Sequence, residues 1–169
     1  MNGRRAIDGV SDRPGDYYRQ IPQSLAHHGF LVVVPDYRGH NDSSCAEFTL
    51  QKTSPRWYAR DVLDIVNALD DIDNADTDHL FMLGHSMGAQ MTLLVAVATL
   101  GDELEGASIW STHITTETDV NSEELKTISS QLQLIDSPLN IYHAKGDQIA
   151  LFKGSTIIAN QLRQMGKPY

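Results

Sequence analysis

The feature that most constrains the fold of this chain is the pentapeptide at residues 84–88, which has the pattern G-x-S-x-G. It stands between an apolar run at 80–83 and a second, helix-like apolar run at 89–96. A serine on a sharp turn between a strand and a helix crowds its backbone neighbours, and glycine on either side tolerates that crowding best. The pattern therefore predicts that Ser86 projects its hydroxyl from the C-terminal edge of a sheet.

Hydrophobic spacing upstream of this turn predicts a helix, a strand and a second helix. Apolar residues between 17 and 26 recur at steps of three and four, and Gly29 supplies a C-terminal stop. The continuous apolar run at 30–34 suits a strand that is covered on both faces. Between 57 and 72, an apolar stripe at steps of three and four predicts an amphipathic helix.

Downstream of the turn, strands and helices continue to alternate. Short strands are expected at 107–110 and 139–142, and helices at 122–134 and 151–165, the last of them closed by Gly166. This alternation predicts a three-layer α/β/α arrangement around a mostly parallel sheet. In such sheets ligands bind beyond the carboxyl ends of the strands, which is where Ser86 is expected.

Three segments, residues 34–43, 83–90 and 137–147, together resemble the α/β-hydrolase superfamily. Within it they are similar to the S9-like branch, which is related to prolyl oligopeptidase and dienelactone hydrolase. The resemblance implies a serine hydrolase that cleaves a carboxylic ester or a peptide bond through an acyl-enzyme, without a cofactor or a metal. It also implies the site residues: Ser86 as nucleophile, the backbone N–H of Met87 in the oxyanion hole, and Asp147 as the acid of the triad.

Asp147 comes shortly after the strand expected at 139–142 and directly after Gly146. In a triad, the carboxylate fixes the tautomer of a histidine and stabilises the imidazolium that forms when the serine loses its proton. The order of serine before aspartate is that of the superfamily. The alternative is a solvated turn aspartate, since Gly-Asp pairs are common in turns.

The same order places a histidine after the acid, and residues 148–169 contain none. Among the seven histidines, His40 and His113 follow expected strand ends and are the substitutes that could lie on the catalytic face. His85 is the residue before the serine and is expected to point away from it. The other four are expected at helix ends or beside strands: His27, His28, His79 and His143.

Compared with members of the superfamily that it resembles, the chain also has a short N-terminal part. A family member would have at least three strands before the helix that starts near residue 16, and a loop after the third would complete the oxyanion hole. Residues 4–10 stand in that place, so the backbone N–H of Val10 is the expected second donor. We therefore expect one partial α/β-hydrolase domain over 1–169, with the N-terminal strands and the final strand missing, as in a truncated reading frame or a decayed copy.

Composition restricts the kinds of binding partner and the cellular location that we expect for this chain. A net charge of −9 argues against nucleic-acid binding, because phosphate affinity needs clustered Lys and Arg. No apolar run approaches the roughly 18 residues of a membrane-spanning helix, and no cleavable signal stands at the start, so the cytoplasm is expected. Cys45 is the one cysteine, which allows neither an internal disulfide nor a cysteine-based zinc site.

Two hypotheses of different class remain. The first is a serine hydrolase that acts on a small-molecule ester or peptide. The second is a catalytically incompetent fragment or pseudoenzyme that keeps the serine turn and lacks the triad histidine. A homodimer, in which a second chain fills a vacant strand position, is a further alternative.

Overall fold

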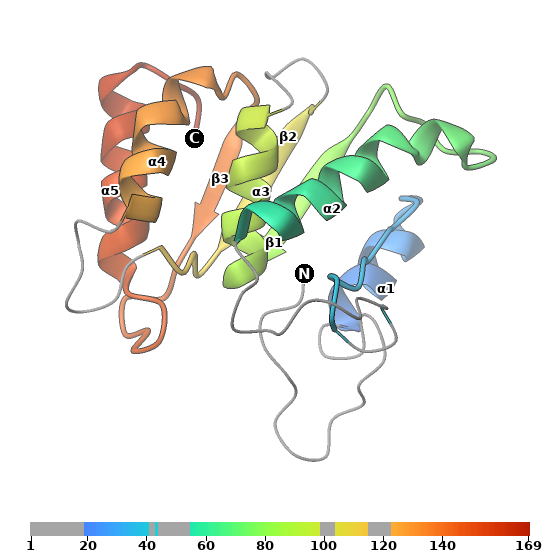
Figure 1. Cartoon of the computed structure of the whole chain (residues 1–169), viewed down its shortest axis with the longest axis horizontal. Helices are drawn as coiled ribbons and strands as arrows, with labels where there is room; N and C mark the ends of the chain where they lie inside the picture. Colours follow the sequence, from blue (N-terminus) through green and yellow to red (C-terminus); the bar gives the residue numbers. More distant parts are fainter. Residues whose placement is uncertain (1–18, 41–42, 44–54, 99–103, 115–122) are drawn as a thin grey trace. The chain divides into compact units, whose positions relative to one another are not determined.

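The computed structural model describes residues 19–40, 43, 55–98, 104–114 and 123–169 (Figure 1). The chain divides into two compact units, residues 1–75 and 76–169. Each unit is described by itself, and the expectation of one domain over 1–169 stays a prediction.

The first unit contains two helices where the sequence predicted them. Helix α1 spans Gln20–His27 and ends before Gly29, whose φ of +91° lies in the left-handed region that glycine adopts without a steric penalty. Helix α2 spans Pro55–Asn67 and is followed by a short 3₁₀ helix, Leu69–Asp71. The apolar stripe between 57 and 72 thus forms one helix and one further turn.

An aromatic and ionic cluster joins residues 37–38 to α2. The buried ring of Tyr37 lies 5.0 Å from the ring of Tyr58, measured between centroids. The Nε of Arg38 donates to both carboxylate oxygens of Asp61 at 2.9 Å, and its guanidinium carbon lies 5.0 Å from the ring centroid of Trp57. Burial, and then the charge of Asp61, raise the pKa of the Tyr37 phenol well above its ordinary value, so this hydroxyl stays neutral.

The strand expected at 30–34 is not formed. Phe30, Leu31 and Val33 are 47%, 58% and 42% exposed, and the segment carries no strand pairing. A β-branched run becomes a strand only when a neighbour takes up its backbone N–H and C=O groups. All strand pairs within the described ranges join strands of the other unit, so the expectation of a covered strand was wrong. Residues 4–10, expected near this strand, lie outside the described residues.

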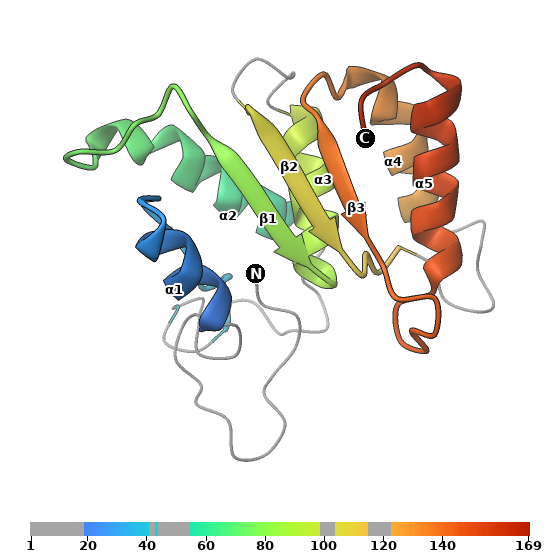
Figure 2. The same cartoon turned by 180° about the vertical axis from the view of Figure 1, so that it is seen from behind.

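The second unit is built on a three-stranded parallel sheet in the order β1-β2-β3. The strands are β1 (Phe81–His85), β2 (Gly106–Trp110) and β3 (Leu139–Tyr142). They alternate with α3 (Met87–Ala98), α4 (Glu123–Gln131), a 3₁₀ helix (Leu132–Leu134) and α5 (Phe152–Gln164). Helices α3 and α4 lie in front of the strands in Figure 1 and behind them in Figure 2, so they cover the same face. The predicted α/β class and its parallel sheet are confirmed.

The core of this unit lies between the sheet and its helices. Helix α3 is apolar on nearly all sides and is buried along most of its length, as expected of a helix in the centre of a core. Leu93 of α3, Ile109 of β2 and Ile158 of α5 are fully buried. Each such side chain contributes about 1.5–3 kcal/mol by leaving water. The N-terminus of α3, which follows Ser86, therefore stands on a firmly packed element.

The outer strands are open over much of their length. Within the part of the chain that the structure describes, no strand pairs with the far side of β1. On the far side of β3, the Leu139 N–H donates to the carbonyl oxygen of Pro168 at 3.3 Å. The sheet is thus the incomplete form of the expected fold. A search of the same residues finds no helix with the length and apolar character needed to cross a membrane.

Candidate active site

Ser86 occupies a strained turn between β1 and α3. Its φ is +54°, in the left-handed region that non-glycine residues rarely adopt. Its N–H donates to the carbonyl oxygen of Trp110 at 2.9 Å, and its own carbonyl oxygen accepts from the N–H of Ala89 at 3.0 Å. A backbone of this kind costs about 1–3 kcal/mol and persists only where its surroundings hold it. The last step of the sheet and the first turn of α3 hold it here.

Gly84 is required by a close approach of strand to helix. A Cβ at this position would lie 2.2 Å from the carbonyl oxygen of Gly88 and 2.5 Å from the Oγ1 of Thr92. From the sequence, the two flanking glycines were expected because the backbone is crowded around the serine. The structure adds that the first glycine lets β1 lie directly against the first turn of α3.

Met87 is the first residue of α3. The first N–H groups of any helix lack a partner within the helix, and the helix dipole adds positive potential at this end. The N–H of Met87 therefore belongs to a group of donors able to stabilise a negatively charged oxygen beside Ser86. Val10, expected to provide the second donor, lies outside the described residues.

Asp147 lies in the loop between β3 and α5. Its Oδ1 accepts hydrogen bonds from the N–H groups of Ile149 and Ala150, both at 2.9 Å. Partial burial pushes the pKa of the Asp147 carboxyl upward. These two bonds and a third from the Ser111 side chain outweigh burial and bring the pKa below its ordinary value. The carboxyl is therefore ionised at neutral pH.

The parallel sheet brings Ser86 and Asp147 to one edge. Ser86 directly follows β1, Ser111 directly follows β2, and Asp147 lies in the loop after β3. Because parallel strands end at the same side of a sheet, the three residues share its C-terminal edge, and β2 separates the serine from the acid. Ser111 has a φ of +46°, so two of the three strand-end positions are strained.

Two histidines of this unit lie near the acid. His143 directly follows β3, and its side chain is only 1% exposed. His85 is the last residue of β1 and is half-buried. Burial lowers the pKa of His85, and the charge of Asp147 opposes this effect without cancelling it. The sequence analysis named both histidines and predicted no role beside Asp147 for either of them.

The other histidines are distributed over both units. His113 follows β2 and is half-buried. In the first unit, the Nε2 of His40 lies 3.3 Å from the hydroxyl oxygen of Tyr58, and its ring packs against those of Tyr37 and Tyr58. His40 follows no strand, because residues 30–34 form none, and this corrects its expected placement. His79 pairs with Asp76 at 3.0 Å on the surface.

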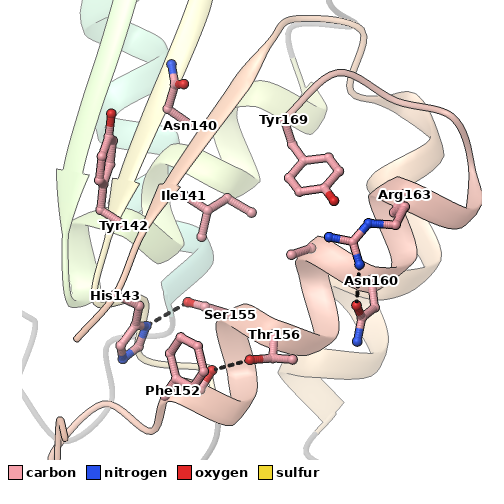
Figure 3. A pocket seen from close by; sticks show the side chains of 11 residues that line it. Asn140, Ile141, Tyr142, His143, Phe152, Ser155, Thr156, Asn160, Arg163 and Tyr169 are labelled. Carbon is pink, nitrogen blue, oxygen red and sulfur yellow. Dashed lines mark hydrogen bonds between the residues drawn. The ribbon is translucent and has the colours of Figure 1, made fainter. Parts of the chain in front are cut away.

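A hollow of about 620 Å³ lies between β3 and α5 (Figure 3). Its wall contains the aromatic rings of Tyr142, Phe152 and Tyr169 together with the His143–Ser155 pair. Over the described ranges, no cluster of three His, Cys, Asp or Glu side chains could hold a metal ion. Cys45 lies outside these ranges, and the absence of a metal stays a prediction.

The parallel sheet, the covering helices and the serine turn define an α/β-hydrolase fold. A family model described as serine aminopeptidase, S33 (Hydrolase_4), matches residues 7–122, which is more than half of the chain. The chain belongs to this family. The superfamily expected from the sequence is thereby confirmed, whereas the narrower S9-like branch stays a prediction.

Solved structures support the fold at low sequence identity. A monoacylglycerol lipase from Paleococcus ferrophilus superposes with a TM-score of 0.72 and 14% identity, over 90% of this chain and 77% of the lipase. A meta-cleavage product hydrolase from Pseudomonas fluorescens superposes with a TM-score of 0.64 and 10% identity, over 89% of this chain and 76% of the hydrolase. An acylaminoacyl peptidase from Pyrococcus horikoshii superposes with a TM-score of 0.56 and 15% identity, over 66% of this chain and 22% of the peptidase. A search of curated protein sequences finds no significant match.

Proposed function

We propose that this chain is a serine hydrolase that cleaves a carboxylic ester or a peptide bond, with Ser86 as its nucleophile. The observation that carries the proposal is the strained backbone of Ser86, at φ +54°, between the β1–β2 ladder and the start of α3. Strain of this kind collects at functional sites, because it presents a side chain that relaxed backbone would not.

The proposed reaction proceeds in two halves. The Oγ of Ser86 attacks the substrate carbonyl carbon while a base removes its proton, and the tetrahedral oxyanion is stabilised by the N–H of Met87 and the α3 dipole. The leaving alcohol or amine takes the proton, and water then hydrolyses the acyl-enzyme to a carboxylic acid and free Ser86. This chemistry needs no cofactor or metal.

Asp147 is the proposed acid, because it is ionised and lies at the same sheet edge as Ser86. Its role would be to orient the base and to stabilise it when protonated. His113 and His40 remain the proposed substitutes for the base. The histidine that serves as the base must come within hydrogen-bonding distance of the Ser86 Oγ in the substrate complex.

The substrate class follows from the family and the sequence together. The family description names an aminopeptidase, and the similar structures include proteins named as a lipase and as a peptidase. All of these names concern acyl groups on oxygen or nitrogen. We therefore propose a small-molecule ester or peptide as substrate, and the S9-like branch as the finer assignment that the three sequence segments favour.

The second candidate function is a pseudoenzyme that keeps the scaffold without the chemistry. His143 favours this alternative, since it is the histidine beside Asp147 and both of its ring nitrogens are engaged: Nδ1 with Ser155 and Nε2 with the Ala150 carbonyl, each at 2.7 Å. To serve Ser86 it would have to leave both partners. A fragment without a working base would bind acyl compounds weakly and turn over none.

Labelling with a fluorophosphonate probe tests the two candidates directly, because the reagent reports an activated serine whatever the natural substrate. The wild-type chain, Ser86→Ala and the control Ser24→Ala, at an exposed position of α1, would be labelled side by side, after circular dichroism has shown that each is folded. Labelling that disappears only in Ser86→Ala supports the hydrolase. Labelling that persists in Ser86→Ala overturns it, and a folded wild-type chain without labelling supports the pseudoenzyme.

The remaining expectations belong to the same proposal: a cytoplasmic location, no binding to nucleic acid or membrane, and a homodimer as an alternative to the monomer. Light scattering across a range of concentrations would test the dimer. Cell fractionation of the full-length gene product would test the location.

A further inference from the structure

His143 forms a buried link between β3, the Asp147 loop and α5. Its side chain is 1% exposed, and Ser155, its partner on α5, is 2% exposed. Figure 3 shows the imidazole directed at Ser155 beside the ring of Phe152, and the two rings meet edge to face with centroids 5.7 Å apart. The imidazole is therefore fixed on several sides.

The two hydrogen bonds of this ring determine its tautomer. A backbone carbonyl oxygen only accepts, so the 2.7 Å bond to the Ala150 carbonyl requires that Nε2 carry the proton. In the neutral ring Nδ1 is then an acceptor, and the Ser155 hydroxyl donates to it at 2.7 Å. The Ala150 carbonyl thus selects the tautomer of His143, and the Ser155 hydroxyl, which can donate or accept, gives the remaining ring nitrogen a partner.

Ala150 connects this pair to the acid. Its carbonyl oxygen accepts from His143, and its N–H donates to the Oδ1 of Asp147 at 2.9 Å, beside the equally long bond from Ile149. The Oδ2 of Asp147 lies 3.7 Å from the Nε2 of His143. Ile149 is 80% exposed and gives the loop no burial, so hydrogen bonds and the buried Ala150 hold its shape.

We propose that His143 is a positioning residue for Asp147: by donating Nε2–H to the Ala150 carbonyl, with its Nδ1 bonded to Ser155, it holds the two N–H groups that orient the carboxylate. The positional role stands on the geometry alone. Its consequence for catalysis rests on the function proposed above, in which Asp147 is the acid.

Two amide variants of the full chain separate the two bonds. His143→Gln places a side-chain amide near the position of Nε2 and keeps a donor for Ala150. His143→Asn places its polar atoms near Nδ1 and keeps a partner for Ser155 while it removes the bond to Ala150. If His143 acts only by holding α5, His143→Asn should preserve the structure of the Asp147 loop better than His143→Gln. If His143 positions Asp147, His143→Gln should preserve it better.

Amide hydrogen exchange at Ile149 and Ala150, read by NMR, is the measurement. We expect His143→Gln to keep the wild-type protection of both amides and His143→Asn to exchange about tenfold faster, as expected for the loss of one buried hydrogen bond. The imidazole nitrogen shifts of the wild type should report a proton on Nε2. Equal protection in both variants, or a proton on Nδ1, would overturn the proposal.

Ser155→Ala provides a second variant in case the histidine variants do not fold. It keeps the helix and removes the partner of Nδ1, so the imidazole is held by Ala150 alone and faster exchange at Ala150 is expected. Unchanged exchange at Ala150 contradicts the proposal. Fluorophosphonate labelling of the same samples tests the proposed hydrolase function separately from the positioning role of His143. If the wild-type chain is not labelled, the hydrolase function is contradicted, and the exchange measurement still decides the role of His143.

Discussion

The backbone N–H of Ser86 donates a 2.9 Å hydrogen bond to the carbonyl oxygen of Trp110, so the strained serine is part of the sheet ladder. One strand further, the N–H of Ser111 donates to the carbonyl oxygen of Tyr142 at 2.8 Å. Both serines have positive φ, and both begin a turn away from the sheet. The ladder thus extends one residue beyond the strands and holds two unfavourable backbones at one edge.

Gly84→Ala should destabilise the chain by at least about 1–3 kcal/mol. The new Cβ meets backbone atoms of Gly88 at 2.2 and 2.4 Å, and backbone in the first turn of a buried helix cannot rotate away as a side chain can. Urea unfolding of both proteins measures the difference. Gly146→Ala is the matched control, because a Cβ there has no atom within 4 Å, and it should change stability by less than about 1 kcal/mol. Equal effects at both positions would contradict the close approach.

Ser86→Gly should be more stable than Ser86→Ala by about 1 kcal/mol. Relief of a left-handed residue contributes roughly 1–2 kcal/mol, and the greater freedom of glycine in the unfolded chain offsets part of it. Thermal or urea unfolding of the two variants gives the comparison. At Ser130, in α4, the same pair should show the opposite order, because glycine costs about 1 kcal/mol relative to alanine in a helix. The same order at both sites would refute the strain at Ser86.

Asp147→Asn should reduce stability most at neutral pH and least in acid. The pKa of Asp147 is lowered on folding, so its charge stabilises the folded state above the ordinary carboxyl pKa of about 3.9, and this contribution is lost as pH falls toward the folded pKa. Urea unfolding between about pH 3 and pH 7 would show the difference between wild type and variant shrinking as pH falls. Asp70→Asn, on an exposed side chain, corrects for the change in net charge. A difference that grows toward low pH would contradict the shift.

His85 should titrate below its ordinary pKa of 6.5. Burial disfavours the imidazolium in the folded state, so the neutral ring contributes stability above pH 6.5 that is lost as pH falls through the folded pKa. The NMR shift of the ring Hε1 proton against pH gives the midpoint. In His85→Gln this part of the acid sensitivity should disappear. A midpoint above 6.5 would show that the charge of Asp147 outweighs burial.

The local features of this protein could be predicted from the sequence. The strand at 139–142, the stops at Gly29 and Gly166 and the turn at Ser86 follow from hydrophobic periodicity and from the chemistry of glycine, which act over a few residues. The parallel α/β class follows from their alternation. The nearness of Ser86 and Asp147 at one sheet edge follows in turn from the class.

Contacts between distant residues could not be predicted in this way. Residues 30–34 have the composition of a strand, yet a strand also needs a partner, which periodicity does not supply. The reason for Gly84 lies in the position of Gly88 across the turn. The hydrogen bonds of His143 depend on Ser155 and Ala150, which approach it only when α5 packs beside β3. The sequence alone thus determined the elements of the second unit and the sheet edge where they present their polar residues, because local propensity and periodicity encode both. The tertiary structure decided whether residues 30–34 are paired, and which groups at that edge are bonded, strained or left exposed, because hydrogen bonding depends on distances between remote parts of the chain.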